Sequence, residues 1–217
     1  MKYEDSYRHK GLRQQLMEEI KAKGIRDTKV LEAIVNVPRH LFMDSSFLEF
    51  AYIDKAFPIG SGQTISQPYT VAFQTELLEV EKGMKVLEVG TGSGYQACVL
   101  VEMGAKVYSI ERQKSLYQRA KTLLPEIGYR LKQISYGDGY KGLPAWAPFD
   151  RIIVTAAAPS IPSPLIDQLK PGGIMVIPYG ENIQVMKKII KTVSGELLEE
   201  DFGNFRFVPM LSDRAKD

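Results

Sequence analysis

Cysteine, histidine and long apolar runs are all scarce in this sequence of 217 residues. The single cysteine, Cys98, excludes an internal disulfide framework and fits a reducing compartment. The first segment, "MKYEDSYRHKGLRQQLMEEI", lacks the continuous apolar core of a signal peptide, and no stretch of membrane-spanning length is free of charge. We therefore expect a cytoplasmic protein without a membrane partner.

An excess of one charge is also missing, since 28 basic residues face 26 acidic ones and the net charge is +2. No dense basic stripe with interleaved aromatic residues is present, so we expect no nucleic-acid partner. The two histidines, His9 and His40, both lie in the N-terminal part, and His40 in "VPRHLF" is typical of a packing or capping residue. The sequence thus offers no convincing general base, and we expect no metal site.

The pattern of apolar residues changes near Gly83. Before it, apolar residues recur at helical spacing in "YRHKGLRQQLMEEIKAKG" and "DTKVLEAIVNV", and an irregular run, "FPIGSGQTISQP", leads to a third helix near "YTVAFQTELLEV". After it, helices expected from Tyr95, Ser115 and Pro164 alternate with short β-branched runs. These runs are "KVLEVG", "KVYSIE", "LKQISYGDG", "FDRIIVTAA" and "GGIMVIPYG".

Strands that alternate with helices predict right-handed crossovers and a mostly parallel, doubly wound, Rossmann-like α/β sheet. Beyond Gly180, "QVMKKIIKTV", "SGELLEEDFG" and "FRFVPM" predict antiparallel strands that close one edge. We therefore expect a single domain over residues 1–217, with an N-terminal helical segment (1–82), an α/β core (83–180) and C-terminal antiparallel strands (181–217).

The loop after the first core strand, "LEVGTGSGYQA", carries glycine at every second position. In open α/β sheets, ligands bind beyond the carboxyl ends of the strands, where such glycines let a ligand approach the main chain. Gly92, Gly94 and Ala97 formally satisfy a dinucleotide fingerprint, but Gly90 has already begun the turn two residues earlier. A phosphate-binding loop is less consistent still, because no Lys-Ser or Lys-Thr follows.

The better match is E-x-G-x-G-x-G, which resembles motif I of the class I methyltransferases that bind S-adenosyl-L-methionine. That cofactor carries a carboxylate and an ammonium group but no pyrophosphate, so an acid beside the loop is tolerable. The resemblance implies that the loop holds the cofactor. The residues assigned to it are Glu88, Gly90, Thr91, Gly92, Ser93 and Gly94.

Two later strand ends carry further acids. Glu111 ends "KVYSIE" at the distance where nucleotide-binding folds place a carboxylate for ribose hydroxyls. Asp138 and Gly139 in "YGDGY" follow the third strand, where a carboxylate and close backbone could meet an adenine edge. Taken singly, Glu111 could be a solvated charge and "GDG" an Asx turn. Three successive strand ends with suitable residues favour cofactor binding.

The acceptor of the methyl group is indicated by what is missing. "VTAAAPSIP" after the fourth strand has no Asn or Asp with Pro-Pro and an aromatic residue, the pattern typical of amino-group methyltransferases. An acceptor that is ionised at neutral pH, such as a carboxylate with a pKa near ~4, needs no base. The hydroxyls of Thr64 and Ser66 in "GQTISQP" could hold that carboxylate, or they could cap the following helix.

Several segments together resemble the protein-L-isoaspartate O-methyltransferase family, from about Leu12 to Leu211. They are "VPRHLF", "AYIDKAFPIGSGQTISQPYTVA", "VLEVGTGSGYQA", "YGDG", "FDRIIVTAAA", "QLKPGGIMVIPYG" and "FRFVPM". The resemblance implies a seven-stranded sheet of the class I type. It also implies methyl transfer from S-adenosyl-L-methionine to the free α-carboxylate of L-isoaspartyl residues, which yields S-adenosyl-L-homocysteine. The ester then loses methanol to give a succinimide, which reopens partly to L-aspartyl.

The resemblance also implies site residues. Ser66 matches the serine treated as the family's active-site residue, with Thr64 beside it, and Val208 matches a C-terminal strand that clamps the substrate peptide. The neighbours Gln63, Ile65 and Gln67 are assigned to substrate binding. The partners expected are isoaspartyl proteins and peptides, and we expect a monomer. Two alternatives stay open: a methyltransferase acting on a small-molecule carboxylate, and a non-enzymatic cofactor sensor.

Overall fold

The computed structural model describes residues 4–215. A seven-stranded sheet forms its centre, with strand order β5-β4-β3-β6-β7-β8-β9. The five strands from β5 to β7 run parallel to one another, and β8 and β9 are antiparallel. These strands are β3 (Lys85–Val89), β4 (Lys106–Glu111), β5 (Gln133–Tyr136), β6 (Phe149–Val154), β7 (Leu169–Tyr179), β8 (Gln184–Lys191) and β9 (Leu197–Phe205). The predicted mostly parallel, seven-stranded sheet is confirmed.

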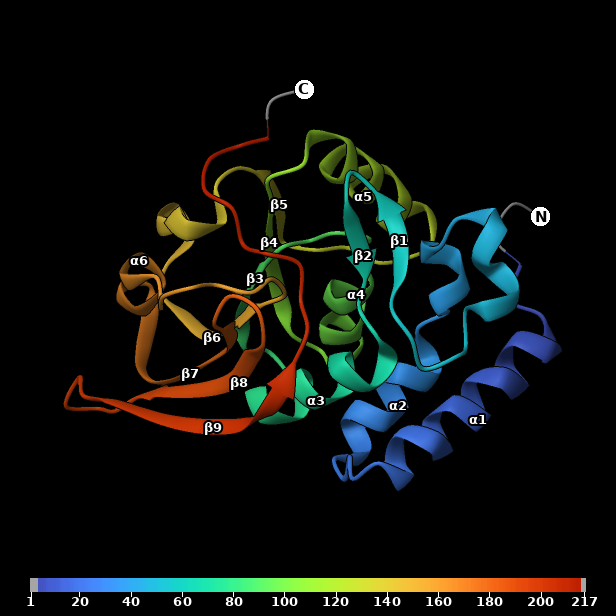
Figure 1. Ribbon diagram of the computed structural model, residues 1–217, viewed down its shortest axis with the longest axis horizontal. Helices are drawn as coiled ribbons and strands as arrows, with labels where there is room; N and C mark the ends of the chain where they lie inside the picture. Colours follow the sequence, from blue (N-terminus) through green and yellow to red (C-terminus); the bar gives the residue numbers. More distant parts are fainter. Residues whose placement is uncertain (1–3, 216–217) are drawn as a thin grey trace.

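Helices cover both faces of this sheet. Helices α3 (Pro68–Leu78), α4 (Tyr95–Glu102) and α5 (Lys114–Glu126) lie on one side, and the short α6 (Ser163–Asp167) lies on the other. Figure 1 shows them to the right and left of the strands. The central strands are buried on both faces, so buried residues do not alternate with exposed ones: "VLEV" in β3 and "IIV" in β6 are buried throughout.

The N-terminal segment is helical, as predicted. Helix α1 (Tyr7–Ala22) begins with a capping box in which Ser6 accepts from the His9 N–H and His9 Nδ1 accepts from the Ser6 N–H. Helix α2 (Thr28–Asn36) is capped by Asp27. The chain then passes through two 3₁₀ turns, η1 (Arg39–Phe42) and η2 (Ser45–Phe50). Between residues 4 and 215 no helix combines the length and apolar character needed to cross a membrane.

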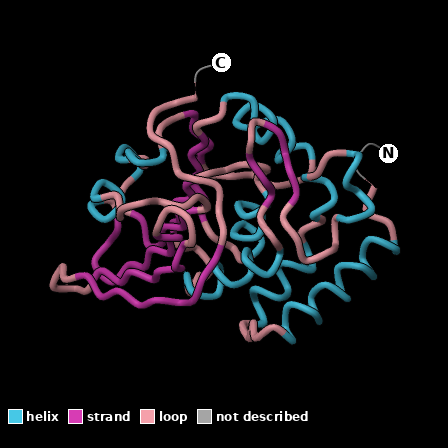
Figure 2. Tube along the Cα trace, viewed as in Figure 1, coloured by secondary structure: helices cyan, strands magenta, loops and turns pink. Residues whose placement is uncertain are grey.

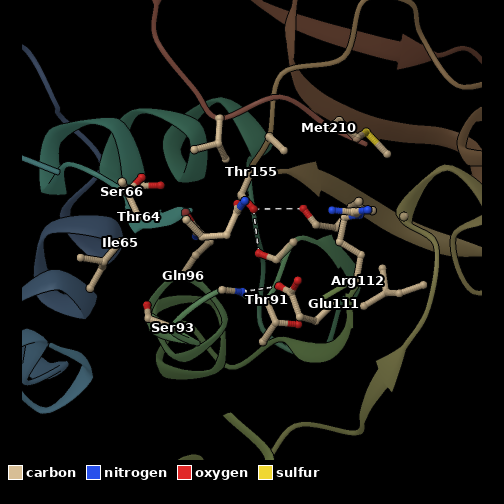
Figure 3. Close-up of a pocket in the computed structure, with 18 of the residues that line it drawn as sticks. Thr64, Ile65, Ser66, Thr91, Ser93, Gln96, Glu111, Arg112, Thr155 and Met210 are labelled. Atoms are coloured by element: carbon tan, nitrogen blue, oxygen red, sulfur yellow. Dashed lines mark hydrogen bonds between the residues drawn. The ribbon is translucent and has the colours of Figure 1, made fainter. Parts of the chain in front are cut away.

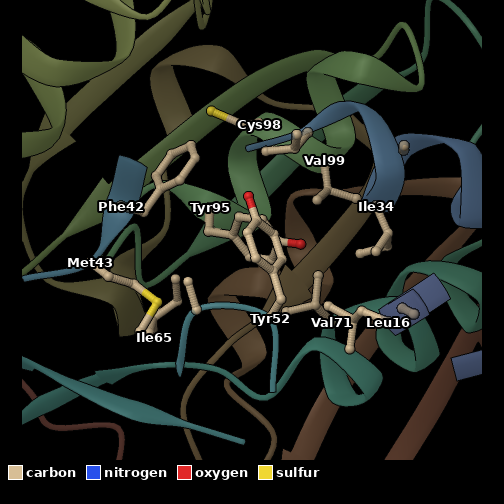
Figure 4. Close-up of a cluster of buried hydrophobic side chains, with 14 of the residues drawn as sticks. Leu16, Ile34, Phe42, Met43, Tyr52, Ile65, Val71, Tyr95, Cys98 and Val99 are labelled. Atoms are coloured by element: carbon tan, nitrogen blue, oxygen red, sulfur yellow. The ribbon is translucent and has the colours of Figure 1, made fainter. Parts of the chain in front are cut away.

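These N-terminal helices pack on α4 through a core that Figure 4 shows in close-up. Ile34 from α2, Val71 from α3 and Val99 from α4 meet there, and Ile65 joins them from the segment before α3. Cys98 lies in the same cluster and is fully buried, where it packs as a small apolar residue. The core therefore fixes the segment before α3 against the sheet's helices.

The predicted irregular run before α3 is in fact ordered. It forms a small antiparallel hairpin of β1 (Phe57–Gly60) and β2 (Gln63–Ile65), separate from the main sheet. The hairpin is short, and its turn contains Gly60, Ser61 and Gly62, all with positive φ. Three- and four-residue strands give too little alternation for a periodicity argument to detect.

The C-terminal strands differ from the prediction in one respect. β8 and β9 form the expected antiparallel hairpin beside β7, but the strand ends at Phe205, so most of "FRFVPM" lies outside it. This segment instead turns back over the sheet, where Ala157 donates to the Val208 carbonyl and Met210 donates to the Ala157 carbonyl. Figure 2 shows the loop rising from β9 toward the C-terminus.

Candidate functional site

The main cavity lies at the carboxyl ends of β3 and β4, beside the point where the winding of the sheet reverses between β3 and β6. It contains about 790 Å³ of empty space, open solvent included. Figure 3 shows Thr64 and Ser66 on one side of it and Glu111, Arg112 and Met210 on the other. Eleven of the fifteen predicted site residues line it: Gln63, Thr64, Ile65, Ser66, Gly90, Thr91, Gly92, Ser93, Glu111, Gly139 and Val208.

The glycine loop forms one wall of this cavity. Gly90 has a φ of +97°, and a Cβ there would lie 2.5 Å from the Thr155 hydroxyl oxygen. That hydroxyl donates to the Gly90 carbonyl at 2.7 Å, so the residue directly after β6 fixes the loop. Gly94 caps α4 in a left-handed conformation, and the Leu124 side chain occupies the place of its missing Cβ. Gly94 thus shapes the turn without lining the cavity.

Glu111 connects the loop to the end of β4. One carboxylate oxygen accepts from the Gly92 N–H at 2.8 Å, and the other accepts from the Gln113 N–H at 2.7 Å. The residue is only 5% exposed, yet it lines the cavity. Two backbone donors fix the carboxylate in place, and its remaining lone pairs can accept from hydroxyl groups of a ligand.

Glu88 lies behind the loop and does not reach the cavity. Its side chain is fully buried and accepts a hydrogen bond from Ser109, whose hydroxyl also meets that of Thr91. Burial, with a smaller contribution from the charge of Glu111, raises the pKa of Glu88 to about 8 despite the lowering effect of the Ser109 hydrogen bond. Successive side chains of β3 point to opposite faces of the sheet, and the side chain of Glu88 points away from the loop. Through the Ser109 hydroxyl, Glu88 supports the hydroxyl of Thr91.

Asp138 is also outside the main cavity. Its carboxylate accepts from the Tyr140 N–H at 2.9 Å and begins the 3₁₀ turn η3 (Gly139–Lys141), as an Asx turn would. It lines a neighbouring cavity with Tyr136 and Arg214. Gly139 does line the main cavity, and a Cβ there would lie 2.6 Å from a methyl group of Val89. The backbone at Gly139 is thus the part of "GDG" that faces a ligand here.

The hairpin β1–β2 and the residues after it form the opposite wall. Within residues 4–215, neither the Thr64 nor the Ser66 hydroxyl has a hydrogen-bond partner, and both residues line the cavity. Helix α3 begins at Pro68 and its cap residue, Gln67, makes no capping bond. The possibility that Ser66 or Thr64 caps this helix is therefore wrong, and both hydroxyls are available to a ligand.

Asp54 carries out the capping instead. Its carboxylate accepts from the Tyr69 N–H at 2.7 Å and from the Gln67 side-chain amide at 2.9 Å, and it forms an ion pair with Lys23 at 2.6 Å. The Asp54 side chain is only 3% exposed. Gln67 is thus turned toward Asp54 and lies outside the main cavity. Because both contacts lie one to three residues after Ser66, Asp54 fixes the segment that follows this hydroxyl.

The C-terminal segment closes the cavity from above. Val208, Met210 and Leu211 line it. Arg112 donates to the carbonyls of Ser212 and Asp213, at 3.4 and 3.1 Å. The chain after β9 is therefore tied to the end of β4.

Several of these residues were not predicted from the sequence. Gln96, Thr155 and Met210 line the cavity, and Asp54 positions it from behind. Asp54 lies within "AYIDKAFPIG", where it and Lys55 are the charged residues of an otherwise apolar run, which was a usable signal. Thr155 follows the fourth core strand directly, which is a place where ligands bind in such sheets. Gln96 and Met210 carried no such signal.

One cluster elsewhere offers metal-binding atoms, although we expected no metal. Atoms of Asp5, His9 and His40 lie within 4.8 Å of one another. Asp5 already forms a bidentate pair with Arg13 at 2.7 and 2.8 Å, and the two rings of His40 and Tyr52 are joined by a hydrogen bond at 2.5 Å. None of these residues lines the main cavity. His40 is buried and packs on His9, as predicted.

Comparison with known proteins agrees with this geometry. The family model described as "Protein-L-isoaspartate(D-aspartate) O-methyltransferase (PCMT)" matches residues 11–215. The chain belongs to this family. A protein-L-isoaspartate O-methyltransferase of Christiangramia forsetii is 62% identical over 210 residues, which cover 97% of this chain and 99% of the relative. One from Flavobacterium psychrophilum is 60% identical over the same shares of both chains.

Two solved structures of isoaspartate O-methyltransferases share the fold. One superposes with a TM-score of 0.82 at 30% identity, and the match covers 91% of this chain and 65% of that one. The other, from Plasmodium falciparum, was solved in complex with S-adenosyl-L-homocysteine. It superposes with a TM-score of 0.79 at 26% identity, over 92% of this chain and 98% of that one.

Proposed function

We propose that this chain transfers a methyl group from S-adenosyl-L-methionine to the free α-carboxylate of L-isoaspartyl residues in damaged proteins and peptides. The observation that carries the proposal is one cavity that joins the glycine loop and Glu111 to the unpaired hydroxyls of Thr64 and Ser66. Membership of the isoaspartate O-methyltransferase family supports the same reaction.

The residues of the cavity fit S-adenosyl-L-methionine. We assign ribose hydroxyls to the Glu111 carboxylate, which two backbone N–H groups already hold in place. The tight backbone at Gly90 and Gly92 admits a ligand to the main chain, and Ile110 and Met210 offer apolar surface for a base. When bound, this cofactor supplies a methyl group activated by a positive sulfur and leaves as S-adenosyl-L-homocysteine.

Among residues 4–215, none that lines the cavity is free to act as a general base. Its titratable lining residues are Glu111, Arg112 and Tyr95. Glu111 is committed to two backbone donors, Arg112 to the C-terminal segment, and burial raises the pKa of Tyr95 to about 12. A carboxylate acceptor fits this set, because it attacks in its ionised form and releases no proton.

The chain's contribution is then positioning. Ser66 and Thr64 donate to the acceptor carboxylate and orient one oxygen, while Val208 and its neighbours cover the cavity and exclude water. Holding both reactants in one geometry accounts for catalysis without proton transfer. The resulting ester is the intermediate through which isoaspartyl returns, by way of a succinimide, to aspartyl. We further propose that the enzyme works as a monomer in the cytoplasm, where the unpaired Cys98 stays reduced.

Two peptides that differ only in carrying L-isoaspartate or L-aspartate at one position test this function. With labelled S-adenosyl-L-methionine, we expect base-labile label on the isoaspartyl peptide alone. No label on either peptide, with cofactor binding intact by calorimetry, would contradict the proposal. Label on a small carboxylic acid instead would favour a small-molecule methyltransferase.

A further inference from the structure

A second groove opens beside the main cavity, and Ser66 lines both. The groove runs between the start of α3 and the end of β9, and it contains about 1370 Å³ of empty space, open solvent included. Its large apolar lining residues are Tyr69, Phe73, Ile183, Phe202, Phe205 and Phe207.

These side chains form a partly open aromatic surface. The Phe73 ring lies 5.1 Å from Phe205, 5.7 Å from Tyr69 and 6.5 Å from Phe202, measured between ring centroids. The rings are half-buried, and Ile183 at the groove's edge is 60% exposed. A connected apolar surface of this kind beside a reaction site is a usual mark of ligand contact.

We propose that this groove binds an apolar side chain of the substrate peptide, within about three residues of the isoaspartyl residue. The inference rests on the proposed function, which places the isoaspartyl carboxylate at Ser66. An extended peptide advances about 3.3–3.6 Å per residue, so a chain anchored at Ser66 reaches the adjoining groove within a few residues. The occupant is a peptide side chain because the groove is continuous with the peptide's own anchoring point.

The inference predicts which damage sites the enzyme prefers. An apolar neighbour of isoaspartate is free to enter the groove only where the damaged segment has left its own protein's core. The groove therefore favours unfolded or loosely packed segments over native surface loops, whose exposed residues are mostly polar.

A set of isoaspartyl peptides tests the groove directly. The host peptide carries glycine and serine around isoaspartate, and a single phenylalanine is moved from three residues before it to three residues after it. The measured quantity is the ratio of kcat/KM for each phenylalanine peptide to that for the host. In the wild-type protein we expect a ratio of about ten at one or two positions, from partial burial of one aromatic side chain.

Two variants locate the effect. In Phe205→Ala and Ile183→Ser, the ratio should fall toward one. Val193→Ser serves as a matched control, since Val193 is 87% exposed and does not line the groove, and its ratio should stay near ten. Ile183 is largely exposed, so its replacement tests the groove without disturbing a core.

The outcomes separate the two proposals. If the wild-type protein methylates the host peptide but every ratio is near one, the groove inference is overturned while the proposed function stands. A ratio near ten that persists in both groove variants overturns it as well. Methylation of no isoaspartyl peptide at all would overturn the proposed function, and the groove inference with it.

Discussion

Replacing Asp54 should damage catalysis without touching the cavity itself. The Asp54 carboxylate accepts from the Tyr69 N–H at 2.7 Å and the Gln67 side-chain amide at 2.9 Å, on either side of Pro68, the first residue of α3. Both contacts are hydrogen bonds to a charged group, which contribute about 1.5 kcal/mol each at the lower end of their range. The ion pair with Lys23 adds little, because the Lys23 side chain is 40% exposed.

We therefore expect Asp54→Ala to lose about 3 kcal/mol of folding free energy, which lowers Tm by roughly 6–12 °C in a chain of this size. Catalysis should suffer more than stability suggests. An active group displaced by about 1 Å can cost about 100-fold in rate, so kcat/KM for an isoaspartyl peptide should fall about that far. Cofactor affinity should hold, because Asp54 does not contact the glycine loop or Glu111.

The assay pairs isoaspartyl peptide kinetics with calorimetric titration of the cofactor, at a temperature where the variant is folded. Asp27→Ala is the matched control: Asp27 also caps a helix, α2, but away from the cavity, and its loss should cost about 1 kcal/mol of stability and leave kcat/KM unchanged. Wild-type kcat/KM in folded Asp54→Ala, or an equal loss in Asp27→Ala, would refute the positioning role.

Three further variants test the glycine loop and the two acids beside it. Gly90→Ala should weaken cofactor binding by more than about tenfold, because the new Cβ would meet the Thr155 side chain. Gly24→Ala is the control: Gly24 also has a positive φ but open space around it, so this variant should affect stability alone. Equal cofactor affinity in the two variants would contradict this expectation. Glu111→Gln should lower cofactor affinity about tenfold by calorimetry, since one backbone donor loses its acceptor. Burial raises the pKa of Glu88 to about 8, so the folded state keeps a proton that the unfolded state loses above about pH 4.5. Between about pH 4.5 and 8, this group therefore lowers the free energy of unfolding as pH rises, by up to about 1.4 kcal/mol per pH unit. Glu88→Gln should therefore gain stability relative to wild type from pH 5.5 to 7.5 in urea unfolding, and a difference that is the same at both pH values would count against the assignment.

The main sheet could be predicted because its signals are local and repeated. Most core strands are short apolar runs followed by a helical stretch, so the order of elements predicts a doubly wound sheet. The glycine loop and Glu111 were found for the same reason: both stand at strand ends, which meet at one edge. The antiparallel hairpin after Gly180 followed from two alternating runs with a turn between them.

Long-range contacts explain what the sequence did not reveal. Asp54 acts on a helix that begins fourteen residues later, and Arg112 holds carbonyls about a hundred residues away. No periodicity or spacing rule connects such positions. Glu88 and Gly94 belong to a recognisable motif, but the pleat of β3 and the packing of Leu124 turn them from the cavity, and a motif does not state which of its members touch a ligand.

The central claim is that Ser66 and its neighbours hold an ionised acceptor, with no base involved. Single-turnover transfer to an isoaspartyl peptide, from cofactor-loaded protein between pH 5.5 and 7.5, tests it most directly. We predict a rate constant that is independent of pH in the wild type and about 100-fold lower in Ser66→Ala, with cofactor affinity unchanged. A wild-type rate that rises with pH through a pKa in this range, or full transfer by Ser66→Ala, would contradict the account.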